Sequence, residues 1–251
     1  MSRSWRLALF ILGASGIAIL FFLALRTVPS SNGLGDRYAQ QINSRTFPER
    51  NITDAVTAVN FDYRGFDTVG EEFILFVSVL GSLLLLRMAE ERKEKLLIDA
   101  AEPWRDVGPS DATRLWILSM IAPKVVFGMY IITHGQLTPG GGFQGGIVLA
   151  SAALILYLGE NFAVFRNVLS RALIEALEAA GAGGFLLIGM LSWFWGRPFL
   201  TDILPLGKAH ELTSGGTIAL ISMATGLEVS AGFILLLYAF LQENLLPSGE
   251  K

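Results

Sequence analysis

The stretch that decides the fold is residues 115–164, LWILSMIAPKVVFGMYIITHGQLTPGGGFQGGIVLASAALILYLGENFAV. It contains two apolar runs, 115–133 and 146–164, joined by a turn rich in glycine. Each run is close to the roughly 20 residues that an α-helix needs to cross the hydrocarbon core of a bilayer. The stretch therefore predicts a pair of transmembrane helices.

The rest of the chain has the composition of a membrane protein. Of its 251 residues, 52% are hydrophobic and 16% are charged, whereas soluble domains carry about 25% charged residues. Further apolar runs lie at 7–25, 70–86, 179–195 and 216–241. We predict an all-α, polytopic transmembrane bundle of about six spans, two before a charged linker and four after it.

Two segments between the first and second spans have distinct patterns. Residues 27–53 are rich in Ser, Asn, Gly, Pro and charges and predict an exposed loop. Apolar residues from Ile52 to Val59 recur at helical spacing over too few turns to span, and predict a short interfacial helix that ends at Arg64 and Gly65.

Charge in the connecting segments suggests the domain boundaries and the orientation. We predict a two-span segment at 1–98, a charged cytoplasmic linker at 99–114 and a four-span domain at 115–251. Lys and Arg are more frequent in the segments on the side of the N-terminus, which favours a multi-pass protein with both termini in the cytoplasm.

Composition also excludes several kinds of chemistry. With no Cys and two His, the chain cannot form a disulfide framework, hold an iron–sulfur cluster, or build a dedicated zinc or haem site, so we expect no cofactor and no metal. A net charge of -3 gives no basic field for nucleic acid. No nucleophile and base lie at a recognisable spacing, so we expect no enzyme in this chain alone.

Charged side chains inside the spans are the candidate functional residues, because each costs a few kcal/mol in a bilayer. Lys124 and Glu228 lie near the middle of their spans, where they could form a structural ion pair or a protonatable step in an ion path. His134, at the end of its span, could exchange protons near neutral pH or simply bond to the following turn. Glu71 and Glu72 begin the second span, and Glu71 is the preferred relay candidate.

The glycine-rich turn is the most distinctive segment. It consists of Pro139, Gly140, Gly141, Gly142, Phe143, Gln144, Gly145 and Gly146. It matches a G-x-G-x-x-G pattern but joins two apolar spans, so a dinucleotide site is excluded. Glycine here permits tight turns and close helix packing, with N–H groups that could face an ion path or another subunit.

The turn also carries a family resemblance. Residues 134–146, HGQLTPGGGFQGG, and the following IVLASAALILYL resemble the signature of the subunit-B (MnhB) domain of Mrp-type multisubunit Na+/H+ antiporters. That domain would cover about residues 108–245.

A second resemblance lies upstream. Residues 52–72, ITDAVTAVNFDYRGFDTVGEE, followed by an apolar span, are similar to the small E-type subunit of membrane-bound hydrogenases, which is also the C-terminal part of the large, A-type antiporter subunit. This resemblance covers about residues 35–96 and implies a fusion of two neighbouring subunits. In that family Asp67 and Glu71 match acidic positions linked to ion translocation, within a motif that includes Arg64 and Gly65.

Together the resemblances imply a membrane subunit of a multisubunit monovalent cation (Na+)/proton antiporter in the cell inner (plasma) membrane, contributing to the ion path and to assembly. The alternatives are the membrane arm of a redox-driven pump, such as a membrane-bound hydrogenase or a complex-I-like enzyme, and a purely structural scaffold. The implied partners are large A/D-like and small C/E/F/G-like antiporter subunits, lipid and, in the redox alternative, a redox arm.

Overall fold

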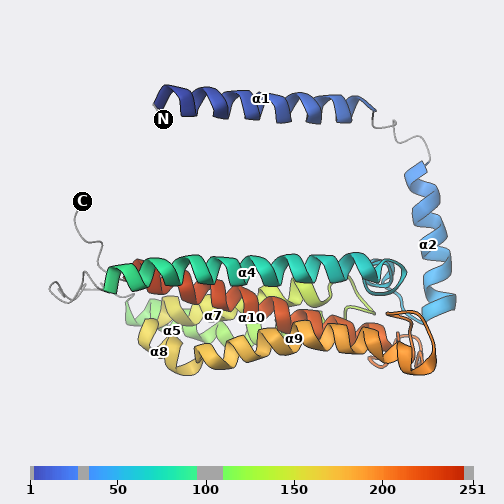
Figure 1. The fold of residues 1–251 in the computed structure, drawn as a ribbon. Helices are drawn as coiled ribbons and strands as arrows, with labels where there is room; N and C mark the ends of the chain where they lie inside the picture. Colours follow the sequence, from blue (N-terminus) through green and yellow to red (C-terminus); the bar gives the residue numbers. More distant parts are fainter. Residues whose placement is uncertain (1–2, 28–33, 95–109, 246–251) are drawn as a thin grey trace. The chain divides into compact units, whose positions relative to one another are not determined.

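The computed structural model describes residues 3–27, 34–94 and 110–245 (Figure 1). Every regular element among these residues is helical, which confirms the expected all-α class. The chain divides into two compact units, residues 1–42 and 43–251.

The first unit contains α1 (Arg3–Thr27) and the beginning of α2 (Leu34–Arg50). The first apolar run is helical, as predicted, and forms α1. Its described apolar part, Phe10–Leu23, is shorter than each of the five candidate spans. That α1 crosses the membrane stays a prediction.

Helix α2 corrects the loop expected at residues 27–53. The residues that disfavour helix are concentrated before it, in the PSSNG run at 29–33, whereas 34–50 is supplied with Leu, Ala, Gln, Arg and Glu, which favour helix. Pro48 lacks the N–H that would bond four residues back, and α2 ends two residues after it, at Arg50.

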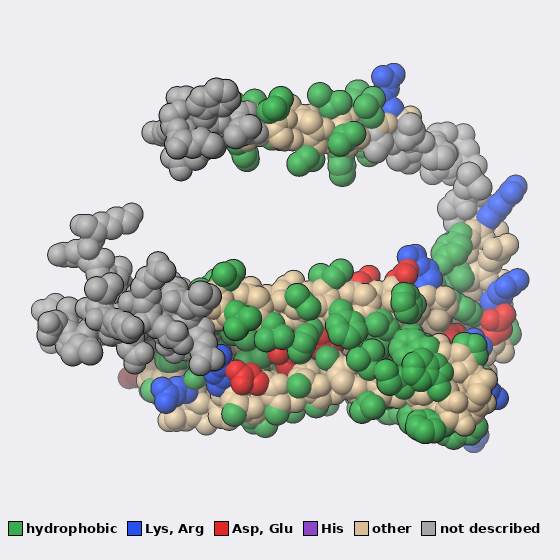
Figure 2. All heavy atoms as spheres, in the orientation of Figure 1, with side chains coloured by type: hydrophobic (Ala, Val, Ile, Leu, Met, Phe, Trp, Pro, Cys, Tyr) green, Lys and Arg blue, Asp and Glu red, His purple; other side chains and the backbone are tan. Residues whose placement is uncertain are grey.

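The second unit contains five helices that are long and apolar enough to cross a membrane, within the residues described. They are α4 (Gly65–Glu94), α5 (Asp111–Ser119) continued by α6 (Ile121–Thr133), α7 (Gly142–Gly159), α9 (Arg171–Leu191) with the 3-10 turn η2 (Ser192–Trp195), and α10 (Thr217–Leu245). The short elements are α3 (Ala55–Ala58), the π-helical turn η1 (Val59–Tyr63) and α8 (Phe162–Val168). On the face shown in Figure 2, hydrophobic side chains are spread along this unit and Lys and Arg lie mainly near its ends.

Helix α10 is the centre of this bundle. Within its span 61% of the residues are buried, compared with 11% in the span formed by α5 and α6. It packs against α9, α7 and α4, which run alongside it (Figure 1). A helix surrounded on several sides must be apolar over most of its surface, and the charged residue in the middle of α10, Glu228, lies inside protein.

Glycine allows the neighbouring helices to approach α10 closely. A Cβ at Gly146 on α7 would lie 2.8 Å from the Cβ of Val229. On α9, a Cβ at Gly181 would lie 2.7 Å from the Cα of Glu228. Because these distances are shorter than any real Cβ contact, the packing of α7 and α9 on α10 depends on the missing side chains.

The short helix predicted before Arg64 is present as α3 and η1. Asp54 caps it, since its Oδ2 accepts a hydrogen bond of 2.9 Å from the backbone N–H of Thr57. Its Ala58 and Phe61 are buried together with Phe185 of α9. The apolar side of this short helix therefore packs into the protein core.

Several span boundaries differ from the predicted ones. Helix α4 begins at Gly65, ahead of the predicted start at 70, and helix α7 covers Gly142–Gly159, where the predicted span was 146–164. Helix α9 begins at Arg171, ahead of the predicted start at 179, because residues 172–178, ALIEALE, are mostly good helix formers. The earlier start of α9 places Glu178 inside the bundle.

We expect Gly181→Ala to destabilise the protein and Gly183→Ala to leave it unchanged or slightly more stable. A methyl group at Gly181 must displace the backbone of α10, at a cost of about 1–3 kcal/mol. At Gly183 on the same helix no atom lies within 4 Å of the added Cβ, and alanine favours helix over glycine by about 1 kcal/mol. Thermal unfolding of the purified protein in detergent, followed by size-exclusion fluorescence, measures both; equal melting temperatures would contradict the packing described here.

Candidate functional site

Three carboxylates from three helices are buried inside the bundle. Glu72 lies on α4, Glu178 on α9 and Glu228 on α10, with 3%, 5% and 0% of their surface exposed. At 1.5 Å per residue, Glu72 lies about 10 Å from the start of α4 and Glu228 about 16 Å from the start of α10. We refer to these three residues as the carboxylate cluster.

Glu72 and Glu228 line the same cavity between α4, α9 and α10, whose apolar wall includes Val69, Phe76 and Phe185. Its volume of about 10 Å³ is on the order of the 10–15 Å³ that one water molecule requires. The cavity thus has room for one small polar occupant beside two acids.

The acids in this cavity lack the partners that buried charges require. In the described part of the chain, no oxygen of Glu72 or Glu228 has a hydrogen-bond partner, and neither does the hydroxyl of Thr225, one turn before Glu228. An unpaired buried charge costs several kcal/mol, and two carboxylates that share a site repel each other. The pair therefore has to hold a proton or a cation.

Glu178 extends the cluster along α10. Its Oε1 lies 3.3 Å from the position of a Cβ at Gly232, which is one turn beyond Glu228. The three acids therefore follow one another across the bundle, from α4 through α10 to α9.

Sequence reasoning missed Glu178 because the predicted fifth span began one residue after it. A signal was present: the buried residues Ile174, Glu178, Gly181 and Phe185 recur at the spacing of one helix face. That periodicity places Glu178 on the apolar, inward-facing side of α9.

The preferred relay candidate, Glu71, is placed differently from Glu72. Glu71 is exposed on α4, whereas Glu72 is buried. Asp67 is also exposed and accepts a hydrogen bond of 2.6 Å from Nε of Arg64. The roles of Glu71 and Asp67 stay predictions.

Lys124 and Glu228 are not brought together. Nζ of Lys124 donates a hydrogen bond of 3.0 Å to Oγ of Ser151 on α7, while Glu228 faces the cavity that it shares with Glu72. No ion pair between Lys124 and Glu228 occurs among the described residues. The predicted structural pair of Lys124 with Glu228 is therefore absent.

His134 is held by its own helix end. Its ring stacks on Tyr130 with 4.0 Å between ring centroids, and its Nδ1 lies 3.2 Å from the backbone oxygen of Tyr130. The described contacts of the His134 ring are therefore with its own helix and not with the following turn, and its role in proton exchange stays a prediction.

Residues 134–138, which lead into the glycine-rich turn, contact the short helix before α4. The backbone oxygen of Gln136 accepts hydrogen bonds of 3.2 and 3.3 Å from the N–H groups of Thr53 and Asp54. The hydroxyl of Thr57 donates to the backbone oxygen of Gly135 over 2.6 Å. This segment therefore anchors the short helix that leads into α4.

Within the turn, glycine is required by the backbone. Gly140 and Gly141 have φ angles of 157° and 115°, which side chains rarely adopt. The N–H of Gly141 donates to the backbone oxygen of Ile131 over 3.2 Å, and that of Gly145 donates to Gly141 over 3.0 Å. These two N–H groups are therefore used internally, and a role of the turn toward an ion path or another subunit stays a prediction.

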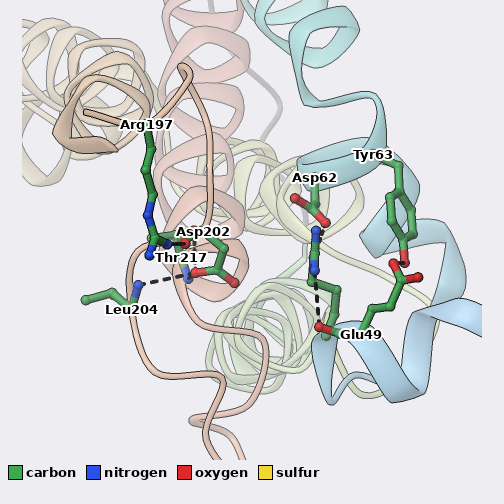
Figure 3. Close-up of polar contacts among 8 residues, drawn as sticks. Glu49, Asp62, Tyr63, Arg197, Asp202, Leu204 and Thr217 are labelled. Atoms are coloured by element: carbon green, nitrogen blue, oxygen red, sulfur yellow. Dashed lines mark hydrogen bonds and ion pairs between the residues drawn. The ribbon is translucent and has the colours of Figure 1, made fainter. Parts of the chain in front are cut away.

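A second, wider cavity of about 630 Å³ lies where α4 and α10 begin (Figure 3). Arg50 forms an ion pair with Asp62 on its wall. Asp202 caps α10, since its Oδ1 accepts hydrogen bonds of 2.9 and 3.0 Å from the N–H and hydroxyl of Thr217, and its backbone oxygen accepts one of 3.3 Å from Arg197. These contacts fix the end of the bundle above the carboxylate cluster.

Two groups on this cavity have shifted pKa values. Burial raises the pKa of Tyr63 above its ordinary value, and the hydrogen bond of 3.0 Å that its hydroxyl donates to Glu49 adds to the effect. Burial by itself lowers the pKa of Arg50, but the contact with Asp62 outweighs it and the pKa is raised. Both groups therefore keep their protons throughout the physiological range.

Comparison with known proteins places the chain in a family. Residues 113–235 match the model described as "Domain related to MnhB subunit of Na+/H+ antiporter". Over 225 residues the chain is 31% identical to the uncharacterized protein MJ1307 of Methanocaldococcus jannaschii, with 80% of this chain and 83% of that protein covered. The chain belongs to the MnhB family.

A probable K+/H+ antiporter protein of Rhizobium meliloti, of the combined A/B type, is 32% identical over 219 residues, which cover 80% of this chain and 21% of that protein. The chain thus spans about a fifth of the length of that MnhB-family relative. With its five apolar helices, this MnhB-family chain is an integral membrane protein.

Two solved structures share the fold. One, a chain of the membrane-bound sulfane sulfur reductase, an archaeal respiratory membrane complex, is 28% identical with a TM-score of 0.69, covering 94% of this chain and 98% of that one. The other, in the Mrp complex from Dietzia sp. DQ12-45-1b, is 20% identical with a TM-score of 0.70, covering 96% of this chain and 26% of that one. Both structures are of complexes, so this fold occurs in chains that assemble with other membrane subunits.

We expect Glu72→Gln and Glu228→Gln to leave the melting temperature of the purified chain unchanged or to raise it. Each change removes a carboxylate that lacks a partner and keeps the shape of the side chain, so the cost of burying charge falls. Thermal unfolding in detergent measures this. A clear loss of stability in both variants would mean that the carboxylates make structural contacts that the described geometry lacks.

Proposed function

We propose that this chain is a membrane subunit of a monovalent cation/proton antiporter complex and that Glu72 and Glu228 hold the ions it exchanges. The observation that carries the proposal is the pair of buried carboxylates that share one small cavity without a hydrogen-bond partner. Membership of the MnhB family supports the antiporter assignment.

The proposed chemistry is competition between a proton and a cation for one neutralised acid pair. Because two negative charges cannot stay unpaired in this apolar setting, arrival of a cation is linked to release of a proton. No covalent step is involved, and the chain acts as a transporter subunit.

The positions of the acids support transfer in the plane of the membrane. Glu178 lies one helical turn along α10 from the shared cavity, and Glu71 is exposed on the other side of α4. We propose that Glu71 faces a neighbouring antiporter-type subunit, so that ions pass from that subunit through Glu72 and Glu228 toward Glu178.

The domain organisation and the orientation belong to the same proposal. The segment 1–98 corresponds to the hydrogenase E-like part, 115–251 to the MnhB-like part, and 99–114 to a linker between them, most of which lies outside the described residues. We place the protein in the plasma membrane with both termini in the cytoplasm, as the distribution of Lys and Arg favours.

One comparison favours a second candidate function, in which the complex also carries a redox arm. The chain covers 98% of a subunit of the sulfane sulfur reductase, a respiratory membrane complex, at 28% identity. In this alternative the same acids move ions, and electron transfer in other subunits supplies the free energy.

We expect Glu72→Gln and Glu228→Gln each to lower cation-dependent proton exchange at least tenfold, because an amide cannot exchange a proton for a cation. The assay is Na+- or K+-induced recovery of a pH-sensitive dye in inverted vesicles that contain the complete complex. The matched control is Glu160→Gln at the end of α7, which breaks the ion pair of Glu160 with Arg114 away from the shared cavity and should retain activity.

Glu71→Gln, tested in the same vesicles, should also reduce exchange while leaving assembly intact. Normal exchange in both Glu72→Gln and Glu228→Gln, with the complex present at its usual level, would refute the role proposed for the shared cavity.

Purification of a tagged chain from its native membrane distinguishes the two candidate functions. We expect antiporter-type membrane subunits to co-purify in mild detergent, as identified by mass spectrometry. Additional subunits with metal clusters would establish the redox-driven alternative, and a chain that purifies alone would contradict both.

A further inference from the structure

Lys124 is an ionisable residue of the predicted set that lies inside a span and outside the carboxylate cluster. It lies on α6, about 20 Å along the axis from the start of α5 and about 13 Å from the end of α6. At this depth the side chain lies too far from either helix end for the ammonium group to reach the membrane surface readily.

Lys124 has one polar contact in the described structure. Its ammonium group carries three donors, and one of them is directed to Oγ of Ser151. The hydroxyl of Ser151 in turn donates to the backbone oxygen of Val148 over 2.6 Å. Serine supplies no negative charge, so this contact orients the ammonium group without neutralising it.

The border between α6 and α7 at Lys124 is uncovered on its outer side. Only 11% of the residues in the span formed by α5 and α6 are buried, the lowest share of the five spans described. Phe127, about 60° around α6 from Lys124, is 56% exposed, and Ile147 and Leu154, one turn to either side of Ser151 on α7, are 49% and 40% exposed. Gly128 and Ile132 face α7 and α10. Helix α6 therefore presents, along its border with α7, an apolar surface with one half-buried cation near its middle.

We propose that this surface of α6 binds a transmembrane helix of another subunit that carries an Asp or Glu at the depth of Lys124. Charge complementarity selects the partner, because a cation at mid-membrane requires an anion and lipid tails offer none. An apolar helix surface around a single ion pair fixes both the depth and the rotation of the partner helix. This role concerns assembly and is independent of the function proposed for Glu72 and Glu228.

The first test uses charge at position 124. Lys124→Met should reduce the recovery of the partner subunit with the tagged chain at least tenfold in mild detergent, while Lys124→Arg should retain it. The amount of the chain in the membrane, measured by immunoblot, shows that the Met variant still inserts and folds. Recovery of every subunit at wild-type levels with Lys124→Met would overturn the proposal.

The second test identifies the partner in the membrane. Because the chain has no Cys, Phe127→Cys provides a single thiol on the exposed side of α6 next to Lys124 for a short photoactivatable cross-linker. We expect cross-linked peptides from one membrane helix of another subunit with an Asp or Glu within one turn of the link. Cross-links only to lipid, to a second copy of this chain, or to a helix without an acid would refute the proposal.

The results of these two tests can be distinguished from the result of the transport assay. If Glu72→Gln assembles normally but loses exchange, the ion site is supported and the α6 surface is not tested. If Lys124→Met, in which Glu72 and Glu228 are unchanged, loses the partner subunit, the α6 surface is supported and the ion site is not tested.

Discussion

The constraint on which this structure depends is the burial of acids within an apolar helix bundle. Glu228 lies on the helix that packs against α9, α7, α4 and α6, and it is fully buried. In a bilayer, turning such a group to the outside of the bundle would not lower the free-energy cost of its charge, because lipid solvates charge no better than a protein core does. The surrounding helices therefore determine which proton or cation can reach the acid and from which side.

Close helix packing gives the acids their arrangement. Gly181 lets α9 approach the backbone of Glu228 itself, and Gly146 does the same for α7 at Val229. With larger side chains at these positions, the helices would separate and the cavity at Glu72 would widen into an open, hydrated gap. Small residues thus keep the site narrow, and a narrow site makes the charge state of each acid depend on its neighbour.

The sequence was sufficient to predict the membrane class, the positions of the later spans, the glycine-rich turn and the depth of Glu228. It was not sufficient to choose between Glu71 and Glu72, because adjacent residues differ by about 100° around a helix and the rotation of α4 is set by its contacts with α9 and α10. Glu178 was missed for a different reason. The predicted span began at the first uninterrupted apolar residues, and the amphipathic helical turns before them, which contain Glu178, were left out. The loop expected at residues 27–53 failed because Gly, Ser and Asn were counted over the whole segment, although they are concentrated before α2.

The expected contact between Lys124 and Glu228 shows how far depth alone can mislead. Both residues lie near the middle of their spans, and opposite charges at equal depth invite pairing. The structure instead directs Lys124 to Ser151 on α7 and gives Glu228 an acidic neighbour. An ion pair between Lys124 and Glu228 would be the simplest way to neutralise both charges, and the structure does not form it. The separation agrees with the two proposed roles, in which the acids bind mobile ions and Lys124 binds an acid of a partner subunit. An internal ion pair would neutralise both groups and so prevent both roles.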